Sequence, residues 1–140
     1  MRRLGRNRPG VPVLPDVPEQ HRRQAPQAAG CAVVTISDTR TPETDRGGRA
    51  AAELLAGAGH RVVAREIVPD DPDRIRALLS ELCGREDVDA VLTTGGTGLG
   101  SRDRTFETLD AMLEKRLPGF GELFRMLSYE EIGPAAMLSR

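Results

Sequence analysis

Residues 31–38 read Cys-Ala-Val-Val-Thr-Ile-Ser-Asp, and this stretch decides the fold. Its apolar residues are continuous rather than alternating, which is typical of a strand buried on both faces of a parallel sheet. The run ends in Ser37 and Asp38, so polar side chains follow the strand directly. Because ligands bind outside the carboxyl ends of such strands, this end of the run is a candidate site.

Strands and helices are expected to alternate after this run. Apolar stretches predict two further strands, at 60–68 and 88–94. Helical spacing predicts helices at 49–59, 70–84, 104–117 and 121–133. This order predicts a parallel sheet with helices on both faces.

The helices carry readable start, stop and packing signals. Asp71 is expected to cap the 70–84 helix, with Pro72 in its first turn and Gly84 at its end. Thr105 is expected to cap the next helix. The side chains expected to face inward are Ala51, Leu54, Leu55, Ala58, Ile75, Leu78, Leu79, Leu82, Phe106, Leu109, Met112 and Leu113.

Composition limits the class of protein. The 140 residues suit one domain, and a net charge of −1 does not favour nucleic-acid binding. No apolar run reaches the roughly 18 residues of a membrane span, and no signal peptide is expected. Cys31 and Cys83 are far apart with no Cys-x-x-Cys pair, which indicates buried thiols in a reducing cytoplasm rather than a metal or redox site.

The first 29 residues differ from the rest. They hold five prolines and six arginines and almost no bulky apolar residue. Such a segment cannot bury enough surface to offset the entropy of ordering, so we predict a disordered basic tail over 1–29 and a folded domain over 30–140. An RNA-binding or docking arm is the alternative for this tail.

A glycine-rich loop follows the third predicted strand. Residues 95–98 read Gly-Gly-Thr-Gly, and their N–H groups can form a nest around a phosphate, with the positive end of the following helix behind them. A tight strand-to-helix turn is the alternative. A P-loop is excluded because no Lys follows, and a dinucleotide fingerprint because position 97 is Thr.

Two acids are expected beside this loop, at the same sheet edge. Asp70 and Asp103 would be unfavourable near a phosphate unless Mg²⁺ lay between them. Helix capping is the alternative for Asp70, and a solvated loop acid is the alternative for Asp103. No nucleophile stands beside a base, so positioning and charge neutralisation remain, as in phosphoryl and nucleotidyl transfer.

Several stretches, taken together, resemble the MoaB/Mog family of molybdenum cofactor biosynthesis, the MoaB branch more than the MogA branch. They are TISDTRTPETDRGG (35–48), IVPDD (67–71), DAVLTTGGTG (89–98), Arg102-Asp103, PGFGELFRMLSYEEIG (118–133) and AAMLSR (135–140). The resemblance implies a three-layer α/β/α domain with a mostly parallel sheet that binds molybdopterin. It also implies assembly into trimers or hexamers.

The resemblance implies a reaction and its residues. Molybdopterin would take AMP from ATP with Mg²⁺, and Asp70 and Asp103 would be the catalytic and metal-binding acids. The substrate would be held by Ser37, Asp38, Thr94, Gly95, Gly96, Thr97, Gly98 and Ser139. A molybdopterin carrier without transferase activity, or an inactive fragment, are the alternatives.

The sequence departs from the family pattern in three places. Thr105-Phe106 replaces the usual Thr-Pro, and Asp45-Arg-Gly-Gly replaces Asp-Lys-Ser-Gly. The family continues for some thirty residues through a strand, a Leu-Pro-Gly turn and a helix beyond the position of Arg140. We therefore expect a domain that is incomplete at its C-terminus.

Overall fold

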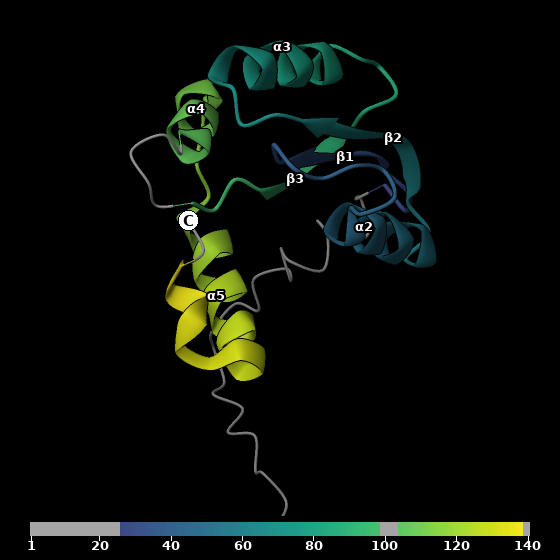
Figure 1. Cartoon of the computed structure of the whole chain (residues 1–140). Coiled ribbons are helices and arrows are strands. Elements are labelled where there is room, and N and C mark those ends of the chain that lie inside the picture. The colour runs from purple at the N-terminus through teal and green to yellow at the C-terminus, as the bar shows by residue number, and fades with distance from the viewer. Residues whose placement is uncertain (1–25, 99–103, 139–140) are drawn as a thin grey trace, which may run out of the picture.

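The computed structural model describes residues 26–98 and 104–138 (Figure 1). Strands and helices alternate over most of this range, as predicted. The elements are β1 (Gly30–Ile36), α2 (Arg46–Gly57), β2 (Arg61–Val68), α3 (Pro72–Cys83), β3 (Ala90–Gly95), α4 (Thr105–Met112), α5 (Pro118–Ile132) and a 3₁₀ helix, η1 (Gly133–Leu138).

The three strands form one parallel sheet in the order β2-β1-β3. All seven residues of the central strand β1 are buried, which confirms the prediction made from its continuous apolar run. Ile36 pairs with Val68 on one side and with Gly95 on the other, so the carboxyl ends of all three strands lie level.

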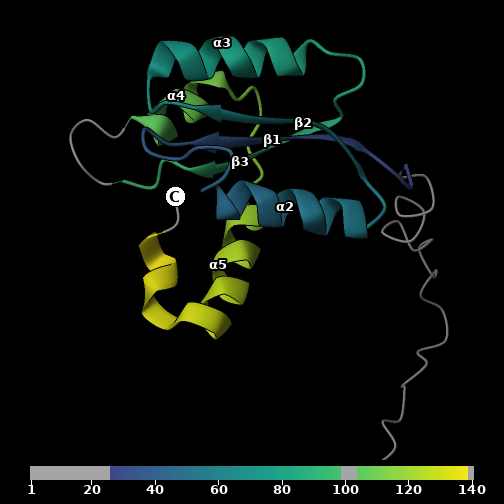
Figure 2. The same cartoon turned by 45° about the vertical axis from the view of Figure 1, so that its right-hand side comes forward.

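Helices cover both faces of the sheet, so the predicted α/β architecture is confirmed. Helices α3 and α4 lie on one side and α2 lies on the other, while α5 and η1 project away from the sheet (Figures 1 and 2). Right-handed crossovers between parallel strands produce this arrangement.

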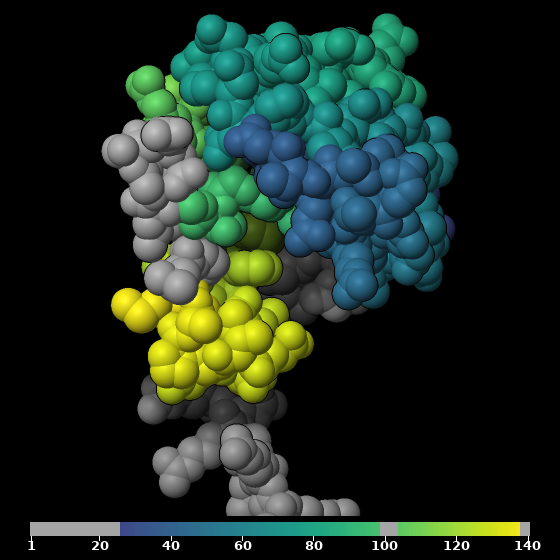
Figure 3. All heavy atoms as spheres, in the orientation of Figure 1, coloured from purple at the N-terminus to yellow at the C-terminus, as the bar shows by residue number. Residues whose placement is uncertain are grey.

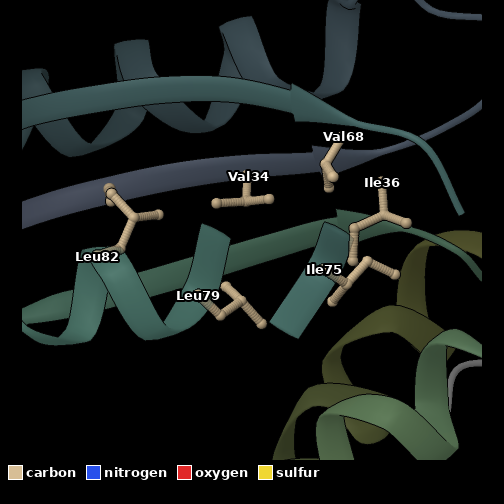
Figure 4. Close-up of a cluster of buried hydrophobic side chains, with 7 residues drawn as sticks. Val34, Ile36, Val68, Ile75, Leu79 and Leu82 are labelled. Carbon is tan, nitrogen blue, oxygen red and sulfur yellow. The ribbon is translucent and has the colours of Figure 1, made fainter. Parts of the chain in front are cut away.

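The core lies between the sheet and α3. Alternate residues of β1 point to this side, and α3 contributes its apolar stripe at helical spacing (Figure 4). As expected, Asp71 caps α3 by accepting the N–H groups of Asp73 and Arg74, and Gly84 is its C-cap. The buried cluster comprises Ala32, Val34, Ile36, Val68, Ile75, Leu79 and Leu82.

Helix α2 begins three residues earlier than predicted, and its buried face differs from the predicted one. Its inner side runs through Gly48, Ala51, Ala52 and Leu55, at spacings of three and four residues. Leu54 lies off this stripe and is 74% exposed, and Ala58, the C-cap residue, is exposed as well, so the predicted inward orientation of both was wrong.

Helix α4 is shorter than predicted, because Leu113 already has extended backbone geometry and the chain turns into α5 at Pro118. Leu109 and Met112 pack against the core as expected. Phe106 and Leu113 were predicted to face inward but are exposed, as are most large apolar side chains of α5.

The predicted tail falls mostly on residues 1–25, which lie outside the described residues; residues 26–29 belong to no helix or strand. Within the described part of the chain, no helix is long and apolar enough to cross a membrane.

A buried carboxylate joins α2 to the sheet. The side chain of Asp45 is 2% exposed and accepts hydrogen bonds from the Gly48 N–H at 2.9 Å and the Thr35 hydroxyl at 3.0 Å. Arg65 of β2 lies 3.5 Å away. Burial acts to raise the pKa of Asp45, but these hydrogen bonds and the Arg65 charge outweigh burial and lower the pKa overall.

We expect Asp45→Asn to destabilise the fold by about 2 kcal/mol at neutral pH, because hydrogen bonds to a charged group lose strength. Since the folded state lowers the pKa of Asp45, its contribution is complete above the ordinary value of 3.8 and is lost as the pH falls through the lower folded value. Urea unfolding of the unmodified chain and of Asp45→Asn, at neutral pH and near pH 3, measures the difference in their free energies of unfolding.

The control is Asp73→Asn, since the Asp73 side chain is 95% exposed. Its free energy of unfolding is expected to change little at either pH. An Asp45→Asn loss that stays equally large near pH 3 would contradict the assignment of this stability to the ionised carboxylate.

Candidate functional site

Three loops meet at the carboxyl edge of the sheet. Asp38 follows β1 and Asp70 follows β2, and the backbone N–H of Asp70 donates to Oδ1 of Asp38 at 3.0 Å. The Asp70 carboxylate in turn accepts a hydrogen bond from the hydroxyl of Thr105, at the start of α4, with Oγ1 and Oδ1 2.5 Å apart. These two bonds connect the ends of β1 and β2 to the helix that follows the glycine loop.

Thr105 has a different role from the predicted one. Arg104 occupies the N-cap position of α4, and its own side chain makes no capping hydrogen bond. Thr105 is instead the first helical residue and is only 3% exposed. A hydroxyl that donates to a carboxylate makes a short, strong hydrogen bond, so Thr105 orients Asp70.

The glycine loop needs glycine at two positions. Gly95 has a φ of +88°, and a Cβ there would lie 2.3 Å from the carbonyl oxygen of Ile36. Gly96 has a φ of +61°, and a Cβ there would lie 2.5 Å from Oγ1 of Thr105. The two glycines therefore allow the loop to approach both β1 and the residue that holds Asp70.

A pocket of about 500 Å³ opens beside this loop. The loop and Thr105 supply polar atoms, while α4, α5 and η1 supply a largely apolar wall. Figure 3 shows the yellow α5–η1 segment as a lobe beneath the green atoms at the end of β3. The wall includes Phe106, Leu109, Phe124, Ser128, Ile132 and Ala136.

The predicted substrate residues fall on two sides of the carboxylates. Thr94, Gly95, Gly96 and Thr97 line this pocket, and Gly98 continues the same loop. Ser37 and Asp38 line a neighbouring pocket, and the Ser37 hydroxyl accepts the N–H groups of Thr39 and Arg40. Asp103 and Ser139 lie outside the described residues.

The pocket wall that α5 and η1 contribute was not predicted from the sequence. Ser128 and Ala136 line the pocket, and the Ser128 hydroxyl donates to the carbonyl of Phe124 within α5. Nothing in their spacing signals a site, because they come from a helix far along the chain. The hydrogen bond of Thr105 to Asp70 was also missed, since a Thr at a helix start favours capping.

The comparison with known proteins identifies the family. The family described as "Probable molybdopterin binding domain" matches residues 32–140. The molybdenum cofactor biosynthesis protein B of Bacillus cereus is 54% identical over 122 residues, which are 86% of this chain and 72% of that protein. The chain belongs to the MoaB/Mog family of molybdenum cofactor biosynthesis.

Solved structures agree with this assignment. A crystal structure of a molybdenum cofactor biosynthesis protein B has a TM-score of 0.77 and 55% identity, over 84% of this chain and 73% of that one. The tungsten cofactor synthesizing protein MoaB of Pyrococcus furiosus has a TM-score of 0.70 and 38% identity, over 83% and 72%. The expected MoaB/Mog fold is therefore confirmed.

We expect Gly96→Ala to destabilise this family member by more than about 1–2 kcal/mol, the cost of a left-handed backbone with a Cβ. The added methyl group also collides with Thr105, which must move away from Asp70. Thermal unfolding measures the loss. Gly57→Ala is the matched control, because a Cβ at Gly57 meets no atom within 4 Å, and equal stability of the two variants would contradict this role of Gly96.

Proposed function

We propose that this chain binds molybdopterin and transfers AMP from ATP to its terminal phosphate. The observation that carries the proposal is the pair of hydrogen bonds that joins Asp38 and Asp70 to Thr105, which lines the glycine-loop pocket. Membership of a molybdopterin-binding family supports the identity of the first substrate.

The pocket suits a ligand with one flat apolar part and one phosphate. Phe106 and Phe124 line the side formed by helices, and the loop at 95–97 lines the other. A pterin ring can pack against the first side, and its phosphate can accept backbone N–H groups from the loop, including Gly96. This orientation points the phosphate towards Thr105 and Asp70.

In the proposed reaction, an oxygen of the terminal phosphate of molybdopterin attacks the α-phosphorus of ATP. The bond from that phosphorus to its bridging oxygen breaks, and pyrophosphate leaves with the electron pair. A phosphate dianion needs no base to remove a proton. The protein therefore acts by alignment and by balancing charge, and the hydrogen bond from Thr105 fixes the orientation of Asp70 for this.

The residues present are compatible with Mg²⁺. No group of three or more acids, histidines or cysteines that could hold a metal lies within residues 26–98 and 104–138. Mg²⁺ does not require one, since it takes one or two carboxylates and completes its shell with water and phosphate. We propose that Asp70, together with Asp103, holds the ion, which would neutralise phosphate charge.

We place the reaction in the cytoplasm and propose that the active species is a trimer or hexamer. Both cysteines are free, which suits a reducing compartment; Cys31 is buried as expected, whereas Cys83 was expected to be buried and is exposed. Most large apolar residues of α5 are exposed, and Phe120 stacks on Phe124 at 6.4 Å. So many exposed large apolar side chains on one helix indicate a protein partner, which we take to be a second copy of the chain.

We expect adenylylated molybdopterin to form when the chain is given molybdopterin, ATP and Mg²⁺. Asp70→Asn keeps an oxygen that accepts from Thr105 but removes the charge, so the rate is expected to fall about a hundredfold or more. Asp103→Asn is expected to behave similarly. Pterin binding, measured by fluorescence in the same samples, is expected to persist.

The matched control is Asp71→Asn. Asp71 is next to Asp70 in sequence but caps α3, and Asn is an equally good cap. Full activity of Asp70→Asn would contradict the catalytic assignment. Pterin binding without product in the unmodified chain would favour the carrier function instead.

We expect sedimentation analysis to show a trimer or hexamer that Leu123→Glu dissociates. Leu123 lies on α5 and is 59% exposed, so a charge there disturbs association rather than the core. Leu54→Glu is the control, because Leu54 is 74% exposed and belongs to a different helix, α2. A monomeric unmodified chain would contradict the proposal.

A further inference from the structure

A second pocket lies beyond Asp38, on the side away from the glycine loop. It has a volume of about 590 Å³ and is formed by the loop after β1 and the end of β2. Asp38 lines this pocket and accepts the N–H of Asp70, whose carboxylate bonds to Thr105 in the wall of the first pocket. The carboxylates therefore lie between two pockets, and the proposed pterin site occupies only one.

Two arginines line the second pocket and are held in place by one loop. Nη1 of Arg40 donates to the carbonyl of Thr44 at 3.1 Å, and Nη2 of Arg65 donates to the carbonyl of Pro42 at 3.1 Å. These bonds engage one terminal nitrogen of each guanidinium. Since a guanidinium has five N–H donors in a fixed fork, both arginines keep donors for a ligand.

A third arginine adds positive charge behind them. Nη2 of Arg49 donates to the same Pro42 carbonyl, at 3.3 Å, and to the carbonyl of Glu43 at 3.2 Å. The guanidiniums of Arg49 and Arg65 therefore lie side by side on one carbonyl oxygen. The carboxylate of Asp45, 3.5 Å from Arg65, balances part of this positive charge, and an anion beside the two guanidiniums can balance the rest.

The pocket also contains acids, which limits what it can hold. Asp38 and Glu66 line it together with Arg40 and Arg65, so its lining has two charges of each sign. A simple anion gains little from such a balanced set. An anion that arrives with a divalent cation fits better, because phosphates pair with arginines while carboxylates face the cation.

We propose that this second pocket binds a diphosphate group, either the β- and γ-phosphates of ATP or free pyrophosphate. Two separately anchored guanidiniums suit two linked phosphates, since each can make a bidentate contact. The proposal rests on the proposed function for its nucleotide. With the diphosphate in this pocket, the α-phosphate of ATP would lie beside Asp38 and Asp70, between the diphosphate and the pterin phosphate. Pyrophosphate would then leave through this pocket.

The test measures binding directly, by calorimetric titration of the whole chain with pyrophosphate, ATP and AMP, each with and without Mg²⁺. Pyrophosphate and ATP are expected to bind, and Arg40→Gln to weaken both about tenfold or more, the effect of losing one hydrogen-bonded charge. AMP lacks the β- and γ-phosphates, so its affinity is expected to stay the same. If Arg40→Gln weakens the binding of ATP but not that of pyrophosphate, the pocket holds the phosphates of the nucleotide and not the free product.

Two further variants separate local effects from unfolding. Arg65→Gln is expected to weaken the same ligands, but Arg65 also bonds to buried Asp45, so its unfolding temperature is measured alongside. Arg76→Gln is the control, because Arg76 lies on α3 and pairs with exposed Asp73. It is expected to bind like the unmodified chain.

The diphosphate site and the transferase activity can be tested separately. Unchanged pyrophosphate and ATP binding by Arg40→Gln, in a chain that still transfers AMP, would overturn the diphosphate site and leave the transferase intact. Absence of pyrophosphate and ATP binding by the unmodified chain would also overturn it. Pyrophosphate binding that depends on Arg40, in a chain that makes no product, would support the site and contradict the transferase.

Discussion

The burial of β1 on both faces is the constraint on which the rest of the structure depends. A strand without a solvent-facing side must have a neighbour on each edge and a layer on each face, and the chain supplies β2, β3, α3 and α2 for these. Because all three strands are parallel, their carboxyl ends lie level. The polar residues that follow each strand are therefore brought together by the same requirement that builds the core.

The site depends on how closely the chain approaches itself at this edge. Gly95 packs against the carbonyl of Ile36, and Gly96 packs against Thr105, at separations that leave no room for a Cβ. Thr105 can then reach Asp70 with its hydroxyl. The loop that lines the pocket and the carboxylate that Thr105 holds are thus positioned by one set of contacts, and a change in the loop is transmitted to the acid.

Much of this arrangement could be predicted from the sequence, for physical reasons. The apolar run at 31–36 and the capped, striped helix at 72–83 carry strong local signals, and both were predicted correctly. The meeting of Asp38, Asp70 and the glycine loop followed from the rule for parallel sheets.

The errors arose where contacts between distant residues decide the outcome. Leu54 has helical spacing with its neighbours, but the face of α2 that packs on the sheet contains Gly48 and Leu55, and Leu54 lies outside it. Thr105 has the composition of a cap, but a carboxylate 35 residues away takes its hydroxyl. The wall from α5 and η1 had no local signal, since only the folded chain brings it to the loop.

Asp45 shows that fold and site share the same electrostatics. Its carboxylate caps α2, binds the hydroxyl of Thr35 on β1 and attracts Arg65, which lines the second pocket. A buried charge is tolerated only when it is paired and hydrogen-bonded, so the fold requires Arg65 to stay near Asp45. That requirement also holds the Arg65 guanidinium at the second pocket, which is the pocket in which we place the diphosphate. A ligand there meets an arginine whose position is already fixed by the core, and binding loses little side-chain entropy.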